Sequence, residues 1–147
     1  MTVTFFGHKD APASIVPLLE ETIRNLIEKQ NADTFYVGNH GNFDFYVARL
    51  LKKLKEEFSH IRYAIVLAYM PQKTDSTYSY IDYADTVLPE DVASCIPKFA
   101  ICRRNDWMLR KSDAVVAYVT HSFGGAAQYR QKAIRQKKTV IDIARYT

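Results

Sequence analysis

The sequence is poor in cysteine, glycine and proline, and each shortage argues against a class of protein. Its 147 residues include two cysteines, five glycines and five prolines. Two cysteines are too few for a disulfide framework, and neither Cys95 nor Cys102 has a C-x-x-C or His-paired spacing, so we predict two free thiols and no metal site. With 48% hydrophobic and 24% charged residues, the composition argues against collagen-like, coiled-coil and disordered classes. We expect one compact domain over residues 1–147.

Long hydrophobic runs are missing too. No run approaches the roughly 20 apolar residues that span a bilayer. The first residues, MTVTFFGHKD, lack the positively charged start and the long apolar core of a secretion signal. We therefore expect a cytoplasmic protein with no membrane partner.

Positive charge is unevenly distributed. Residues 103–138 hold nine Lys or Arg residues against two Asp residues, a net charge of +7, which leaves −3 for the remainder of a chain whose total is +4. Such a segment can attract phosphate-bearing ligands or nucleic acid. It is also typical of a solvated helix face, and the cations close to a helix end favour that interpretation. These cations are Lys132, Arg135, Lys137 and Lys138.

Apolar runs alternate with helical patterns along the chain. The runs predict strands at residues 2–6, 33–39, 62–70, 113–120 and 139–144. Helical spacing of apolar residues predicts helices at residues 15–27, 48–58, 99–111 and 126–137. The first helix should begin near Ser14, because Pro17 is tolerated only in a first turn. Continuously apolar strands alternating with helices indicate a doubly wound α/β fold, with a mainly parallel sheet covered on both faces.

One long connection interrupts this alternation. Residues 71–97 show no clear period and contain Tyr78, Tyr80 and Tyr83. We predict an excursion with a short strand or a helical turn inside. Connections of this length are usually functional or disordered, and whether this one closes over a site as a lid is left open.

The loops after the strands are where a doubly wound fold binds its ligands. Gly7 and Gly38 end strands at sharp turns, and Gly41 permits a close approach or a positive φ angle. The stretch after Gly38 has two interpretations. It is either an anion site at the N-terminus of the next helix, or a turn in which Asn42 or Asp44 is a simple N-cap.

A glycine pair, Gly124 and Gly125, lies between a predicted strand and a predicted helix. Such a pair exposes consecutive amides to a phosphate with no Cβ in the way, and Ser122 adds a hydroxyl donor. The alternative is a tight turn with no ligand.

The helix before the fourth strand carries cations and an indole. Arg103, Trp107 and Arg110 share one face, which suits a phosphate and a base. Trp107 and Met108 are more typical of a core, and whether Arg103 and Arg104 contact a ligand stays open on spacing alone.

Four motifs together resemble a known family. GHKD, FYVGNHGNFD, AICRRNDWMLRKSDAVVAYV and GGAAQYRQKA occur in this order and resemble the YpsA-like branch of the SLOG superfamily, a Rossmann-like group that includes the LOG phosphoribohydrolases and the DNA-binding protein DprA. The resemblance covers about residues 3–143. It implies a Rossmann-like domain that holds a nucleotide or nucleotide-derived ligand at its glycine-rich strand ends and commonly forms a homo-oligomer. We expect no cofactor.

The resemblance and the loop chemistry together give the expected ligand contacts. These are Gly7, His8, Gly38, Asn39, Gly41, Asn42, Asp44, Arg104, Asn105, Ser122, Gly124 and Gly125.

One departure from the family pattern bears on catalysis. The PGGxGTxxE loop of LOG enzymes ends in a catalytic Glu, but here the fifth place after the second glycine is Arg130 and the third is Gln128. Neither can steady an oxocarbenium-like centre or activate water as a carboxylate does. We therefore expect ligand binding or sensing rather than catalysis. The alternatives are an N-glycosidase with a relocated carboxylate, Asp10 or Asp44, and a DprA-like nucleic-acid binder.

Overall fold

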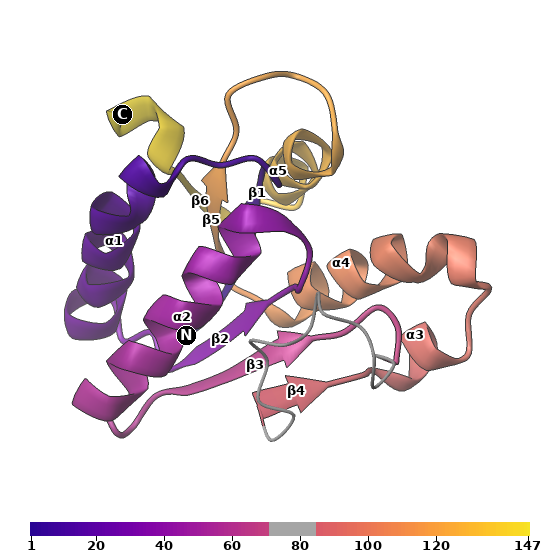
Figure 1. Cartoon of the computed structure of the whole chain (residues 1–147), viewed down its shortest axis with the longest axis horizontal. Helices are drawn as coiled ribbons and strands as arrows, with labels where there is room; N and C mark the ends of the chain where they lie inside the picture. Colours follow the sequence, from indigo (N-terminus) through magenta and orange to yellow (C-terminus); the bar gives the residue numbers. More distant parts are fainter. Residues whose placement is uncertain (71–84) are drawn as a thin grey trace.

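The computed structural model of the protein describes residues 1–70 and 85–147. Its centre is a six-stranded parallel sheet in the order β4-β3-β2-β1-β5-β6 (Figure 1). The strands are β1 (Thr2–Gly7), β2 (Thr34–Val37), β3 (Arg62–Val66), β4 (Thr86–Val87), β5 (Ala114–Tyr118) and β6 (Thr139–Asp142). The predicted doubly wound α/β fold is confirmed.

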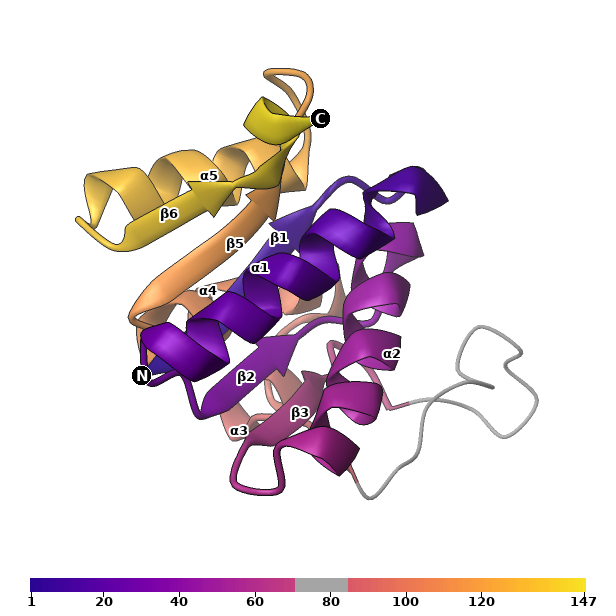
Figure 2. The same cartoon turned by 90° about the vertical axis from the view of Figure 1, so that its left-hand side faces the viewer.

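Helices cover both faces of the sheet. They are α1 (Val16–Lys29), α2 (Gly41–Glu57), α3 (Glu90–Ala93), α4 (Ala100–Lys111) and α5 (Gly125–Arg135), with 3₁₀ turns at Ala13–Ile15, Pro97–Phe99 and Ile143–Tyr146. Helices α1 and α2 lie on one face, and α4 and α5 on the other (Figure 2). None of the helices in the described ranges is both long and apolar enough to cross a membrane.

The two faces of β1 show why its sequence is continuously apolar. Phe5 packs in the core beneath α1 and α2, whereas Phe6 packs against α4 and α5, because successive side chains of a strand point to opposite faces. Each such buried ring stabilises the fold by roughly 2–3 kcal/mol. All five residues of β5 are buried for the same reason.

The helix starts partly follow the predictions. Ser14 lies in the 3₁₀ turn that leads into α1, and Pro17 sits in the first turn of α1 as expected. Helix α2 begins at Gly41 with His40 as its N-cap, so the prediction of Asn42 or Asp44 as the N-cap was wrong. Asp44 is instead inside the first turn, where its Oδ2 accepts a hydrogen bond from the His40 N–H at 3.0 Å, much as the acidic residue of a capping box does.

The long connection contains the short elements that its sequence predicted. Strand β4 and helix α3 both lie within residues 85–97. Tyr78, Tyr80 and Tyr83 are outside the described residues, and the question of a lid stays open.

Both cysteines are free, as predicted. Cys95 is half-buried and Cys102 is exposed. Within the described part of the chain, no three His, Cys, Asp or Glu side chains come together in a group that could hold a metal ion.

Candidate functional site

A pocket of about 530 Å³ lies at the carboxyl ends of the strands. Strand order reverses between β1 and β5, and such a switch point opens a crevice between two loops that leave in opposite directions. The pocket is lined from both loops and from α2, α4 and α5. Seven of the predicted contacts line it: Gly7, His8, Asp44, Arg104, Asn105, Gly124 and Gly125.

The glycine pair forms the start of α5. Gly124 is the N-cap and has a φ of +92°, which a residue with a Cβ rarely adopts. Gly125 is the first helical residue, and a Cβ placed there would meet nothing within 4 Å. The first N–H groups of a helix have no partner within it and carry the positive end of its dipole. These groups therefore border the pocket, with open space in front of Gly125.

Arg104 brings a buried positive charge to the pocket. Its side chain is 3% exposed. It is held by hydrogen bonds from Nη1 to Asn39 Oδ1 at 2.9 Å and from Nε to Asn105 Oδ1, also at 2.9 Å. Nη1 also lies 3.4 Å from the carbonyl oxygen of Val66. A buried guanidinium needs such acceptors, and they fix its position.

Gly38 and Asn39 act on Arg104 rather than on the pocket itself. A Cβ at Gly38 would lie 2.8 Å from both Arg104 Cζ and Asp44 Oδ2, so only glycine leaves room for these two side chains. Neither Gly38 nor Asn39 lines the pocket. Their place in the motif is explained by the positioning of Arg104.

Two titratable groups adjoin Arg104. Burial raises the pKa of Asp44 to about 6, although Arg104 and the His40 N–H act in the opposite direction. Burial and the nearby Arg104 lower the pKa of His40 to about 4. Neutral His40 can therefore place its Nδ1 lone pair 3.3 Å from Arg104 Nη1, and the raised pKa of Asp44 keeps part of this carboxyl group protonated near pH 6.

The N-terminus of α2 holds the first loop. The Asn42 N–H donates to the Lys9 carbonyl oxygen at 2.8 Å, and Asn42 Nδ2 donates to the Ala11 carbonyl oxygen at 3.3 Å. Gly41 has a φ of +90°, and a Cβ there would lie 2.5 Å from Lys9 Cα. Gly41 and Asn42 do not line the pocket, and neither does Ser122, which faces a separate hollow along α5.

The sequence did not predict a column of aromatic rings beside the glycine pair. The His8 ring stacks on His121 with centroids 3.7 Å apart, and His121 stacks on Phe123 at 3.8 Å. His8 is buried and accepts the Thr120 N–H at Nε2, 2.9 Å away. Burial and, secondarily, His121 lower the pKa of His8. The available signal for this column in the sequence was HSF, residues 121–123, which puts two rings directly before the glycines.

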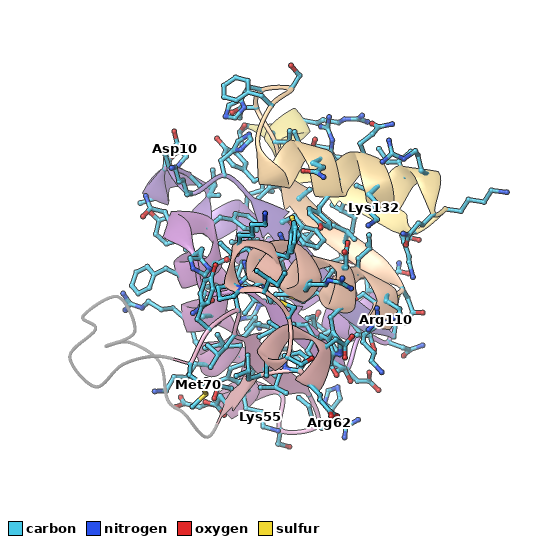
Figure 3. The ribbon with its side chains drawn as sticks, turned by 90° about the vertical axis from the view of Figure 1, so that its right-hand side faces the viewer. Asp10, Lys55, Arg62, Met70, Arg110 and Lys132 are labelled. Carbon is cyan, nitrogen blue, oxygen red and sulfur yellow. The ribbon has the colours of Figure 1, made fainter. Side chains whose placement is uncertain are left out.

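The remaining acidic candidate, Asp10, lines the mouth of the pocket and is exposed. Its side chain points outward at the edge of the molecule (Figure 3). In the PGGxGTxxE pattern the Glu stands six places after the second glycine, so its counterpart here is the exposed Gln131 and not Arg130, and the acid is absent. Arg130 Nη1 donates to Asp142 Oδ2 at 2.5 Å. Arg130 does not line this pocket but lines a neighbouring hollow that shares Gly124 and Gly125 with it.

The face of α4 that carries Arg103, Trp107 and Arg110 does not line the pocket. Met108 is buried in the core as predicted, whereas Trp107 is half-buried and packs against the same cluster, with its ring centroid 5.0 Å from that of Tyr36. Arg103 is exposed and Arg110 pairs with Asp91. The cation that reaches the pocket is Arg104, because it shares the buried face of α4 with Ala100 and Met108, four residues to either side.

Several cations of the basic segment pair with carboxylates. Lys132 Nζ lies 2.6 Å from Asp106 Oδ1, and Lys132 on α5 reaches toward α4 (Figure 3). Arg110 and Arg130 form the pairs described above. These contacts support the interpretation of a solvated, ion-paired helix surface.

The sheet order and the pocket at its switch point together define a Rossmann-like α/β domain. The chain belongs to the YspA SLOG family, whose family model matches residues 1–145, and the resemblance found in the motifs is confirmed.

Among solved structures, the chain is similar to DNA processing protein A (DprA) from Streptococcus pneumoniae, with a TM-score of 0.70 and 14% identity over 95% of this chain and 48% of that one. This chain therefore spans about half the length of that protein, and the similarity shows the fold alone. No curated protein sequence gives a significant match.

Proposed function

We propose that residues 1–147 form one domain that binds or senses a nucleotide or a nucleotide-derived ligand in the pocket at the switch point. One observation carries this proposal: the first turn of α5 at Gly125 and the buried guanidinium of Arg104 line the same pocket. Both attract a negatively charged group. The pocket volume of about 530 Å³ is within the usual range for small-molecule sites.

Within this proposal the predicted contacts divide into two groups. The lining residues contact the ligand, with the phosphate on the amides that follow Gly124 and near Arg104. Asn39 and Gly38 position Arg104, and Gly41 and Asn42 fix the first loop. Ser122 lines a neighbouring hollow that shares Gly124 and Gly125 with this pocket.

Thermal unfolding in the presence of candidate ligands tests the proposal. The panel holds nucleoside monophosphates, cyclic nucleotides and ADP-ribose at millimolar concentration. A ligand at a hundred times its Kd should raise Tm by roughly 5–10 °C, because it binds only the folded state. No shift with any member would contradict the proposal.

Two matched variants locate the effect. Gly125→Asp adds a carboxylate in open space at the first position of α5, where an acid suits the helix dipole but repels a phosphate. It should keep its own Tm and lose the ligand-induced rise. Asn25→Asp makes the same charge change on an exposed part of α1, on the other face of the sheet, and should keep the rise.

A second candidate function is N-glycosidase activity with a relocated acid. Asp44 favours it, because this carboxyl group lines the pocket and has a pKa of about 6, close to the value a general acid needs. Incubation with nucleoside monophosphates, followed by chromatography for free base, tests it. Base release that stops in Asp44→Asn supports Asp44 as the acid. Release that survives both Asp44→Asn and Asp10→Asn removes both candidates.

Nucleic acid is the less favoured partner. The similar protein is named a DNA processing protein, but the ion pairs of Arg110, Arg130 and Lys132 reduce the charge that the basic segment presents. Binding through phosphates would weaken steeply with added salt.

Self-association and a cytoplasmic location stay predictions. Light scattering tests self-association.

A further inference from the structure

The column of rings beside the glycine pair is ordered from its buried end outward. His8 and His121 stack with an angle of 15° between their planes, and His121 and Phe123 with 19°. His8 is 6% exposed and lies edge-on to Tyr118 at 6.2 Å. The column therefore rises from the core at β5, and each ring fixes the orientation of the next.

Phe123 is the outer end of the column and is 70% exposed. Its inner face stacks on His121, and His121 Nδ1 lies 3.0 Å from the Phe123 carbonyl oxygen. A phenylalanine this exposed contributes little by burial to the stability of the fold. The stack on His121 nevertheless holds this ring in place, so little side-chain entropy is lost when a flat ring of a ligand stacks on it.

The position of the ring relates it to the anion site. Phe123 immediately precedes Gly124 in the chain, and both line the same pocket. Ile101, which is 39% exposed on α4, adds an apolar side chain to the lining. A nucleotide has an aromatic base at one end and a phosphate at the other. The ring of Phe123 suits the base, and the amides that follow Gly124 suit the phosphate.

We propose that the outer face of Phe123 is a stacking platform for the base of a nucleoside phosphate. The inference rests on the proposed function and assigns the residue that receives the base of the proposed nucleotide ligand. Stacking on an aromatic side chain tolerates different bases, since each has a π face. A nucleoside monophosphate should bind roughly ten- to a hundredfold more tightly than ribose 5-phosphate, which carries the same phosphate without the base.

Titration calorimetry with the four nucleoside 5′-monophosphates and with ribose 5-phosphate tests this platform. The wild-type protein should prefer at least one monophosphate by tenfold or more. Phe123→Leu keeps an apolar side chain but removes the ring, so this preference should fall to within about threefold while the Kd of ribose 5-phosphate stays within twofold. Phe123→Tyr keeps the ring and should keep the preference. All three proteins should unfold at similar temperatures, because the side chain is outside the core.

The outcomes separate the two proposals. If neither ribose 5-phosphate nor any monophosphate binds the wild-type protein, the proposed function fails. If ribose 5-phosphate binds as tightly as the monophosphates, the anion site stands and the platform is overturned. If Phe123→Leu weakens the affinity for the monophosphates and for ribose 5-phosphate equally, the platform is also overturned, because Phe123 would then shape the glycine loop. If Phe123→Leu keeps the preference but abolishes self-association in sedimentation, the ring is a contact between copies and the platform is overturned.

Discussion

Arg104 and Asn39 are joined by a hydrogen bond of 2.9 Å between Nη1 and Oδ1, across 65 positions of sequence. The bond ties the buried face of α4 to the loop that leaves β2. It gives the pocket a cation whose position is fixed before any ligand arrives, and preorganisation of this kind lowers the ordering cost of binding.

The space beside this bond depends on Gly38. In Gly38→Ala the new Cβ would lie 2.8 Å from Arg104 Cζ and from Asp44 Oδ2, and both side chains are buried. We predict a loss of about 1–3 kcal/mol in the free energy of unfolding, measured by urea denaturation. Gly125→Ala is the matched control, because its Cβ meets open space, and it should leave stability unchanged or raise it by up to about 1 kcal/mol. Equal effects of the two variants would contradict the packing described.

Asp44 gives a prediction for pH. Its folded-state pKa of about 6 exceeds the ordinary 3.8, so folding favours the protonated form. The penalty for ionisation is absent below pH 3.8, grows up to about pH 6 and is complete above it, where it amounts to about 3 kcal/mol. Asp44→Asn cannot ionise. As the pH falls from 7 to 4, the wild-type protein should therefore gain about 2.5 kcal/mol of stability relative to this variant.

Urea denaturation of both proteins between pH 4 and pH 8 measures this difference. His40 has a lowered pKa, so the protein loses stability as the pH falls and this side chain becomes charged, over part of the same range. It titrates in both proteins, so its contribution cancels in the comparison. A difference that does not change with pH would show that Asp44 has an ordinary pKa.

Gln131 allows a test of the missing catalytic Glu. Restoring the acid with Gln131→Glu should not create base release from nucleoside monophosphates, because residue 131 does not line the pocket. Free base released by this variant would contradict the exclusion of residue 131 from the site.

The neighbouring Arg130 allows a test of its ion pair with Asp142. Arg130→Glu should lower the free energy of unfolding by about 2 kcal/mol or more, since a carboxylate would face the buried Asp142 in place of its partner. Arg130→Gln, which removes the charge without reversing it, should lose less.

The fold was predictable because its signals are local. Strands such as β5 are buried on both faces and so are continuously apolar, and helices separate them in the chain. The helical face of Arg104 was also readable in principle, since Arg104 lies between Ala100 and Met108 at a spacing of four residues. The resemblance to the family named Arg104 as a ligand contact, whereas helical spacing alone left its role open.

Other parts of the site depend on contacts between distant segments. His8 and His121 stack although more than 100 residues separate them, and no local pattern reveals that pairing. The N-terminus of α2 was a reasonable anion site by default. The carbonyl oxygen of Lys9 accepts the Asn42 N–H instead, which follows from the path of the first loop and not from the sequence around Gly41.

The amide resonances of the five glycines test the central claim most directly. In ¹H–¹⁵N correlation spectra recorded while a nucleoside monophosphate is added, Gly124 and Gly125 should shift the most and in a saturable manner. Gly38 and Gly41, which lie behind the pocket wall, should shift less. No shift at any glycine with millimolar ligand, or the largest shifts at Gly38 and Gly41 with Gly124 and Gly125 unmoved, would contradict a nucleotide site at the start of α5.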